Sequence, residues 1–311
     1  MYKIIYAPLL LLIFTHFSFA QTKKQNFTLE PKTIASFPFD SIISKKENGQ
    51  IVIRREYQYI DSLNFYGFNY QSFDNLRIRG FLIEPKKKGI YPVLIYNRGG
   101  NGDFGKIPFQ YLARFLGKIA NKGYVIIGSQ LRGNAASEGF DEFGGKDVND
   151  VLSLLDIIDQ LPNVDNKRIG VFGWSRGVMT NFLMLKKTNR IKTNIAIAGQ
   201  ADLLDNKRLD MFGVFRQRIP NYAKDSIAAL KTRSSLLAID SIQNKQLTSF
   251  IIQGNKDERV PIDNAFKFYS KLSSSSFTTR LLVYENENHS LESVRDSKLL
   301  DEIEDWLRRY L

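Results

Sequence analysis

A serine flanked by glycines is the residue in this sequence best suited to nucleophilic chemistry. The motif Gly173-Trp174-Ser175-Arg176-Gly177 follows the apolar residues 168–172 and precedes a run with helical apolar spacing. A sharp strand-to-helix turn projects such a serine from the sheet in strained backbone geometry, and its glycines remove side chains that would collide. The pattern predicts that Ser175 is a nucleophile. The alternative is a surface serine that matches a short pattern by chance.

A serine hydroxyl needs a base, and the histidine content leaves one candidate. The sequence has two histidines, and His16 lies in an N-terminal stretch that we expect to be removed. His289 follows the strand-like residues 278–284 and precedes an amphipathic run, so it is expected on a loop. There an imidazole can accept the serine proton and deliver it to the leaving group. A lone histidine is more often structural, so its position rather than its count indicates catalysis.

The third catalytic group is expected between the serine and the histidine in chain order. Asp257 follows the buried strand-like residues 247–253. Open α/β sheets collect functional groups at the carboxyl ends of their strands, and a carboxylate there can orient the imidazole. Glu258 and Asp263 are competing carboxylates farther round the same loop, and a turn-capping role for Asp257 is the structural alternative.

An oxyanion formed during acyl transfer needs hydrogen-bond donors, which a glycine-rich bend can supply. Asn97-Arg98-Gly99-Gly100-Asn101-Gly102 follows the strand-like residues 92–96. We expect backbone N–H groups of Gly99 and Gly100, with the amide of Arg176, to form this oxyanion hole. A plain glycine turn is the alternative reading. Arg98 and Trp174, beside the glycines and the nucleophile, are the candidate substrate-binding residues.

The elements that must position these groups alternate between strands and helices. Apolar strand candidates cover residues 92–96, 124–129, 168–174, 194–198 and 247–253, with helical patterns over 147–161 and 294–311. Buried short strands alternating with helices predict an α/β fold with a mainly parallel twisted sheet and helices on both faces. The earlier stretches 51–53, 64–70 and 76–83 are expected to be consecutive antiparallel strands at one edge.

Two segments depart from this alternation. Residues 200–244 form a long helical insertion, which we expect to be a cap over the site. The alternative is a helical insertion with no role at the site. Residues 1–20 have a lysine, an apolar run and small residues at the end, which predicts a cleaved signal peptide and a secreted or periplasmic protein. An uncleaved membrane anchor is the alternative. Residues 21–50 are expected to be a loose extension, and residues 51–311 the catalytic domain.

Composition excludes several classes of chemistry. The chain has no cysteine, so disulfides and thiolate metal sites are excluded, and a single remaining histidine cannot form a multi-histidine metal site. We predict neither a metal nor a cofactor. The net charge of +12 falls to +11 without Lys3, but the basic residues are scattered, which argues against nucleic-acid binding. No second long apolar run follows the leader, so no stable membrane span is expected in the mature form.

Over roughly residues 76–311 the chain resembles the catalytic domain of the prolyl oligopeptidase family, part of the α/β-hydrolase superfamily. The likeness is carried by a set of short motifs: Arg98-Gly99-Gly100, Arg132-Gly133-Asn134, Glu138-Gly139, Gly144-Gly145-Lys146-Asp147, Gly173-Trp174-Ser175-Arg176-Gly177, Ile219-Pro220-Asn221-Tyr222, Arg233-Ser234 and Gly254-Asn255-Lys256-Asp257-Glu258-Arg259-Val260-Pro261. The resemblance implies an α/β-hydrolase fold with Ser175, Asp257 and His289 as nucleophile, acid and base.

Three differences from the family limit what the resemblance implies. About 55 residues before the likeness are too few for the N-terminal β-propeller of larger members. Arg98 stands where some relatives carry a tyrosine that supports the oxyanion, and Val178 where relatives often have glycine.

The expected function is therefore that of a serine peptidase that acts on small peptides. A carboxylesterase or deacetylase with the same triad is the alternative, and an inactive hydrolase-fold binding protein is a minor one. The sequence does not indicate an oligomeric state.

Overall fold

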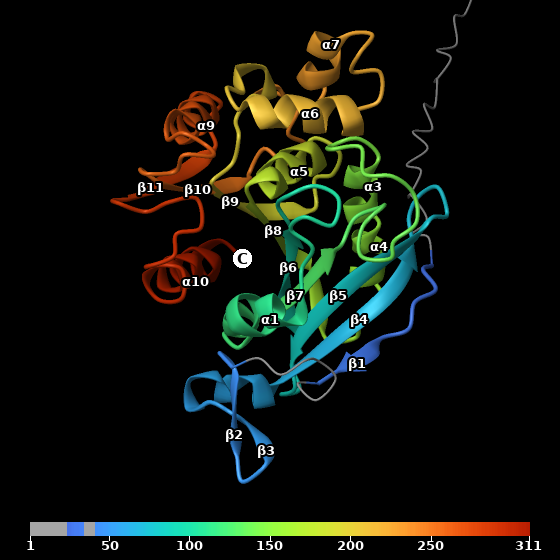
Figure 1. Cartoon of the computed structure of the whole chain (residues 1–311), viewed down its shortest axis with the longest axis vertical. Coiled ribbons are helices and arrows are strands. Elements are labelled where there is room, and N and C mark those ends of the chain that lie inside the picture. The colour runs from blue at the N-terminus through green and yellow to red at the C-terminus, as the bar shows by residue number, and fades with distance from the viewer. Residues whose placement is uncertain (1–23, 34–40) are drawn as a thin grey trace, which may run out of the picture.

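A twisted, nine-stranded sheet organises the computed structural model, which describes residues 24–33 and 41–311 (Figure 1). The strands lie in the order β1-β4-β5-β7-β6-β8-β9-β10-β11. Six of them, from β7 to β11 in that order, pair in parallel, whereas β1, β4 and β5 are antiparallel at one edge. The predicted mainly parallel sheet is confirmed. The strand bounds are β1 Glu30–Lys32, β4 Leu63–Gln71, β5 Arg77–Pro85, β6 Tyr91–Asn97, β7 Val125–Ser129, β8 Val164–Trp174, β9 Ile191–Ile197, β10 Thr248–Gly254 and β11 Thr278–Tyr284.

Side chains alternate between the two faces of the sheet and belong to two separate core clusters. In β6, Val93 and Ile95 lie in the first cluster, whereas Leu94 and Tyr96 lie in the second. Successive side chains of a strand point to opposite faces, so the clusters lie on opposite sides of the sheet. Both faces are buried, which explains why the central strands are continuous apolar runs rather than alternating ones.

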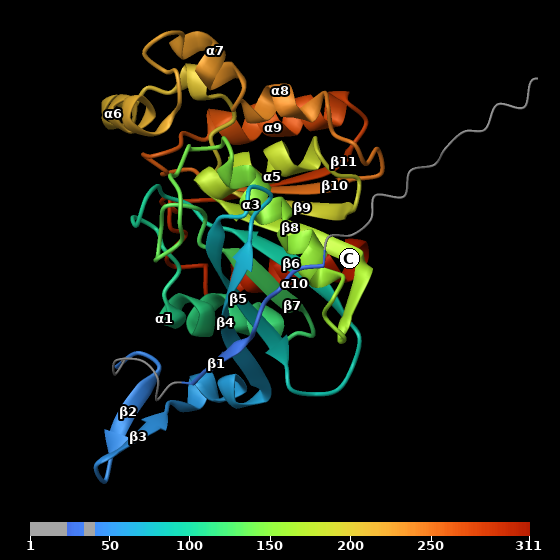
Figure 2. The ribbon, with the colours of Figure 1, turned by 90° about the vertical axis from the view of Figure 1, so that its right-hand side faces the viewer.

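Helices cover each face. The first cluster contains residues from α3 (Asp147–Leu152), α4 (Leu154–Ile158), α5 (Arg176–Leu185), α8 (Ser235–Ile239) and α9 (Asp263–Ser274). The second contains residues from α1 (Phe109–Tyr111), the π-helical turn η3 (Leu112–Leu116), α2 (Gly117–Ala120) and α10 (Lys298–Tyr310). The views in Figures 1 and 2 show these two groups on either side of the strands. The prediction of helices on both faces is confirmed.

The predicted helix over residues 147–161 is interrupted. It consists of α3 and α4, with a turn at Ser153 between them. The Ser153 hydroxyl donates to the carbonyl of Asn149 at 3.0 Å, a back-bond that competes with the helical hydrogen-bond ladder. The last helix begins at Lys298, a few residues later than the predicted start at 294.

Described parts of the predicted loose extension form strands. Within the predicted loose extension 21–50, β1 pairs with β4, and the carboxylate of Glu30 lies 2.7 Å from Nη2 of Arg79. The prediction that residues 51–53 join the antiparallel edge was wrong. They belong to β3 (Gln50–Ile53), which pairs with β2 (Ser44–Glu47) in a separate hairpin.

The hairpin is explained by its turn. Asn48 and Gly49 both have positive φ, 50° and 79°, which is the geometry that an Asn-Gly hairpin turn requires. The 3₁₀ helix η2 (Arg55–Ser62) then leads from the hairpin into β4. The predicted signal peptide, residues 1–20, lies outside the described residues.

The predicted insertion forms a helical layer between β9 and β10. It contains η4 (Leu203–Asp205), α6 (Leu209–Arg218), α7 (Ser226–Lys231) and α8. Side chains of Asp225 and Ser234 cap α7 and α8 by accepting from Ala228 N and Leu237 N, which fixes where these helices begin. In Figures 1 and 2, α6 and α7 stand at the end of the molecule opposite the β2–β3 hairpin. Over the residues that the structure describes, no helix is both long and apolar enough to span a membrane.

Candidate active site

Ser175 occupies a strained turn between β8 and α5. Its φ and ψ are 57° and −121°, and its N–H donates to the carbonyl of Ile197 at 2.8 Å. Positive φ in a non-glycine residue stores strain of about 1–3 kcal/mol, which the surrounding structure must hold in place. The flanking glycines permit this turn. A Cβ on Gly173 would lie 2.4 Å from the carbonyl oxygen of Gly177, and a Cβ on Gly177 would lie 1.9 Å from that of Asn97.

His289 and Asp257 form a hydrogen bond at the carboxyl end of β10. The distance from His289 Nδ1 to Asp257 Oδ2 is 2.7 Å, and the Asp257 side chain is fully buried. An ionised carboxylate only accepts hydrogen bonds, so this contact places a proton on Nδ1 and leaves Nε2 as the basic nitrogen. The remaining acceptor positions of Asp257 receive hydrogen bonds from Arg259 N, Val260 N and Gln253 Nε2.

The competing carboxylates lie elsewhere. Glu258 is exposed, and Asp263 forms an ion pair with Lys267 on the surface at 3.3 Å. Of the three carboxylates considered from the sequence, Asp257 is the one that contacts the imidazole.

Ser175 and His289 line the same cavity, whose volume is about 610 Å³. The indole Nε1 of Trp174 donates to the carbonyl of His289 at 3.0 Å, which ties the histidine loop to the residue before the nucleophile. In the described part of the chain, Ser175 Oγ is not hydrogen-bonded to the ring. Catalytic hydrogen bonds often tighten only when a substrate is bound, so both groups remain candidates. Trp174 itself lines the cavity, in a position where it can contact a substrate.

The glycine-rich bend after β6 approaches the nucleophile closely. A Cβ on Gly99 would lie 3.2 Å from Ser175 Cβ and 3.8 Å from its Oγ. Gly100 has φ of 71°, and a Cβ there would lie 2.1 Å from the carbonyl oxygen of Phe104. Both glycines line the cavity with Arg176, so the three expected oxyanion residues are brought together around Ser175.

Arg98 has a structural position rather than the predicted substrate-binding one. Its side chain is 1% exposed, and it is not among the residues that line the cavity. Its guanidinium donates to four backbone carbonyls: those of Gly99, Gly102, Phe104 and Gln130. Burial lowers the pKa of Arg98 to about 10, which still leaves it charged at neutral pH. Because its donors are taken up by these carbonyls, Arg98 stabilises the glycine-rich bend. It does not reach the cavity, so it cannot contact a ligand there.

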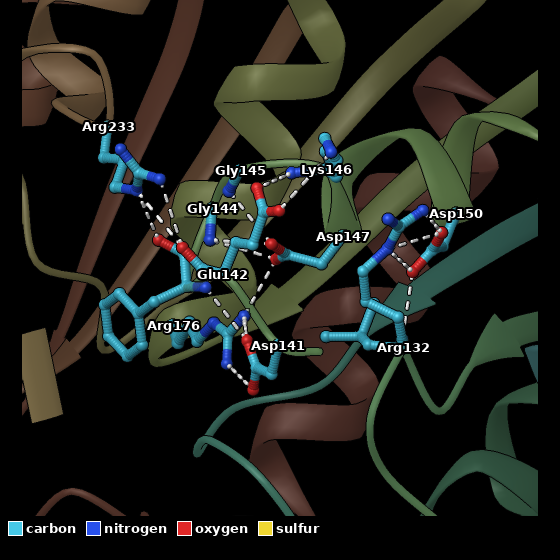
Figure 3. A network of polar contacts seen from close by, with 12 residues as sticks. Arg132, Asp141, Glu142, Gly144, Gly145, Lys146, Asp147, Asp150, Arg176 and Arg233 are labelled. Carbon is cyan, nitrogen blue, oxygen red and sulfur yellow. Dashed lines mark hydrogen bonds and ion pairs between the residues drawn. The ribbon is translucent and has the colours of Figure 1, made fainter. Parts of the chain in front are cut away.

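Arg176 connects the nucleophile to two neighbouring loops through a buried charge network (Figure 3). Its Nη2 lies 2.6 Å from Asp141 Oδ1 and 2.8 Å from Asp147 Oδ2, and both carboxylates are fully buried. Its Nη1 donates to the carbonyl of Gly100 at 3.0 Å, and Asp141 accepts from the N–H of Gly102. The side chain after the nucleophile therefore fixes the bend that we expect to form the oxyanion hole.

Asp141 was not predicted from the sequence. It lies in an irregular loop, and neither its neighbours nor its spacing distinguishes it from a solvated aspartate. A second buried arginine, Arg132, pairs with Asp150 at 2.6 Å and so connects the end of β7 to α3 (Figure 3). It also pairs with Asp74 at 2.9 Å. The family motifs around Arg132 and Asp147 thus mark structural ion pairs.

The side chains that line the cavity fall into two groups, which we call its two compartments. The first group consists of apolar side chains of the first core cluster, such as Met179, Met211, Val214 and Phe215, three of them from α6 of the insertion. The second group consists of side chains of the second cluster and the His289 loop: Tyr96, Tyr111, Trp174, Ser290 and Arg295. The predicted cap therefore contributes directly to the site. Among the described residues, no group of three or more His, Cys, Asp or Glu side chains could hold a metal ion.

Comparison with known proteins identifies a family for the sequence. The sequence model described as Prolyl oligopeptidase family matches residues 110–311. The uncharacterized peptidase YtmA of Bacillus subtilis (strain 168) is 25% identical over 241 residues, which cover 76% of this chain and 90% of YtmA.

Solved structures share the fold. A dipeptidyl peptidase 4 of Porphyromonas gingivalis superposes with a TM-score of 0.64 at 24% identity, covering 80% of this chain and 36% of that one. An acetyl xylan esterase from Paenibacillus sp. R4 has a TM-score of 0.65 at 15% identity, covering 93% and 90%. The chain thus spans only about a third of the larger peptidase but nearly the whole of YtmA and of the esterase.

Proposed function

The chain belongs to the prolyl oligopeptidase family, and we propose that it is a serine peptidase that cleaves small peptides through an acyl-enzyme. One observation carries this proposal. The buried Asp257–His289 hydrogen bond and the strained Ser175 turn border a single cavity. Three groups from distant parts of the sequence have the chemistry and the order of a Ser-His-Asp triad.

The reaction follows from these positions. Ser175 Oγ attacks the scissile carbonyl carbon while His289 Nε2 takes its proton, and Asp257 stabilises the imidazolium. The oxyanion accepts hydrogen bonds from the amide of Arg176 and from the Gly99–Gly100 bend. His289 then protonates the leaving amine as the C–N bond breaks. Water, deprotonated by His289, attacks the acyl-enzyme and releases the acid.

Ester hydrolysis is a second candidate because the same groups catalyse it and the fold matches an acetyl xylan esterase over most of both chains. That match reflects the fold, and unrelated functions share this fold. Amide cleavage depends more strongly on protonation of the leaving group by His289. Matched amide and ester substrates with the same acyl group distinguish the two functions. Turnover of esters alone across a broad panel would exclude the peptidase.

The triad is tested with Ser175→Ala, with Ser273→Ala as the matched control on the exposed side of α9. We expect Ser175→Ala to keep its circular dichroism spectrum but to lose activity by about 10⁶-fold, together with labelling by a fluorophosphonate probe. Ser273→Ala should retain both. Substantial turnover by purified Ser175→Ala would show that the nucleophile is another residue.

We also propose that the protein is exported, from the predicted signal peptide at residues 1–20. N-terminal sequencing of the protein recovered from its native cells should begin near Gln21. Recovery of an intact Met1 terminus in the soluble cell interior would reject export.

A further inference from the structure

The compartment beside His289 has a feature that the triad does not use. During acylation the leaving amine must lie within reach of His289 Nε2, because that nitrogen supplies its proton. The compartment lined by Ser290 and Arg295 lies on the same loop as His289, and Trp174 is hydrogen-bonded to that loop. The leaving group is therefore expected on this side, and the acyl group in the apolar compartment beneath α6.

Two tyrosines form a wall of the leaving-group compartment. The hydroxyls of Tyr96 and Tyr111 lie 2.7 Å apart, and both residues line the cavity. Burial raises the pKa of Tyr111 well above its usual range, so its phenol stays protonated. One hydroxyl donates to the other, which leaves one O–H of the pair without an acceptor among the described residues. A ligand with an acceptor oxygen can take that hydrogen bond.

Arg295 supplies a positive charge at the same wall. Its side chain is 26% exposed, lines the cavity and is close enough to Tyr111 to affect its electrostatics. Its ion pair with the adjacent Asp296 is long, at 3.4 Å, and its buried Nε has no hydrogen-bond partner in the described structure. A guanidinium with free N–H donors next to a free phenol O–H can donate hydrogen bonds to the two oxygens of a carboxylate.

The charge of the rest of the cavity favours the same ligand. Among the described residues, Asp210 is the one carboxylate in the lining, and it forms an ion pair with Arg208. Five basic side chains share the lining, but Arg176 is neutralised by the buried Asp141 and Asp147, and Arg208 by Asp210. The cations left to face a substrate are Lys106, Arg259 and Arg295. The cavity thus lacks an unpaired anion for a substrate ammonium group, whereas it attracts substrate anions.

We propose that Tyr96, Tyr111 and Arg295 form a carboxylate subsite, so that the preferred substrates are short peptides whose leaving group ends in a free carboxylate. This inference rests on the proposed serine peptidase function, because it assigns the compartment through leaving-group protonation. It goes further in predicting which end of the peptide is recognised.

The experiment compares two peptide series with the same blocked acyl part and the same scissile bond. One series ends in a free carboxylate after one, two or four leaving-group residues, and the other ends in a carboxamide. We expect the wild type to favour the best free acid by about tenfold or more in kcat/KM, the usual effect of a charged hydrogen bond. Arg295→Met should abolish this preference, and Tyr111→Phe should reduce it. Arg295→Lys should retain part of it.

Arg216→Gln is the matched control, because Arg216 is an exposed arginine of α6 outside the cavity lining. It removes the same net charge and should leave the acid preference unchanged. Equal cleavage of acids and amides by the wild type would overturn the carboxylate subsite while leaving the peptidase proposal intact. An unaltered preference in Arg295→Met would also overturn it. If neither series is cleaved and the fluorophosphonate probe does not label Ser175, the proposed function itself fails.

Discussion

Single residues in this site are constrained by backbone contacts as much as by their chemistry. Gly177 is required because its Cα faces the carbonyl of Asn97, and Gly99 because its Cα faces Ser175. Asp257 accepts three hydrogen bonds besides the one to His289, and these fix the carboxylate in position for the imidazole. A group held in this way needs little reorganisation when charge develops on His289.

At the residue scale, we expect Asp257→Asn to lower kcat by about 10⁴-fold while the protein stays folded. The amide has the size of the carboxylate, but its NH₂ donates to Nδ1 and so selects the tautomer with the proton on Nε2. Steady-state kinetics on the best substrate measures this effect. Asp263→Asn, which removes a surface ion pair with Lys267, is the control and should leave kcat nearly unchanged. A comparable loss in both variants would contradict the assignment.

Among the elements, the turn into α5 and the loop before α3 act as a unit. Arg176 begins α5, and it pairs with Asp141 of the loop and with Asp147, the first residue of α3. Burial alone would raise the pKa of Asp141, but the charge and hydrogen bonds of Arg176, with the N–H groups of Gly102 and Phe143, lower it below its usual range. A carboxylate with a lowered pKa stabilises the folded state at pH values above its unfolded pKa.

At the element scale, Asp141→Asn should destabilise the protein at pH 7 by about 3 kcal/mol, because Arg176 loses one of two buried anions. Since the folded pKa of Asp141 is lowered, its ionic stabilisation is complete above the unfolded pKa of about 4 and is lost as the pH falls further. The difference in free energy of unfolding between wild type and variant should therefore become smaller below about pH 4.

Urea unfolding at a series of pH values measures this difference. Asp165→Asn is the control, because Asp165 at the half-buried start of β8 forms no ion pair among the described residues. If this difference in free energy of unfolding stays constant or increases as the pH is lowered, Asp141 is not stabilised as an anion.

Over the whole molecule, one sheet joins the two core clusters, so neither can unfold without exposing the other. Helix α10 packs against the face of the sheet that carries the second core cluster. Trp306 stacks on Phe250 with ring centroids 5.1 Å apart, and its Nε1 donates to Thr193 Oγ1 at 2.7 Å. On the first face Phe182 of α5 stacks on Phe268 of α9 at 4.9 Å. With no cysteine in the sequence, this packing stabilises the fold without disulfides.

At the scale of the molecule, Trp306→Ala should lower the free energy of unfolding by about 3–5 kcal/mol, since it removes a buried ring and one of the two donors to Thr193 Oγ1. We expect circular dichroism and the loss of probe labelling at Ser175 to shift together, as in a single cooperative transition. Arg309→Ala on the exposed side of α10 should change stability by less than about 0.5 kcal/mol. Two separate transitions in wild type or variant would show that the faces unfold independently.

Sequence alone was sufficient for features that depend on local order. The apolar strands, the mainly parallel sheet and the helices on both faces follow from periodicity and chain order, and the structure confirms them. The candidate triad came from a glycine-flanked serine, an aspartate at a strand end and one loop histidine. These signals are short-range, because each lies within a few residues of the element that positions it.

Only the tertiary structure decided which distant groups meet. The local pattern of residues 51–53 indicates a strand but not its partner, and the Asn48–Gly49 turn assigns it to a separate hairpin. Arg98 lies beside the catalytic glycines in sequence, yet four surrounding carbonyls enclose its guanidinium. Asp141 contacts Arg176 across 35 positions of the chain. Periodicity records whether a side chain is buried but not which charge lies opposite it, so such pairings appear only when the chain is folded.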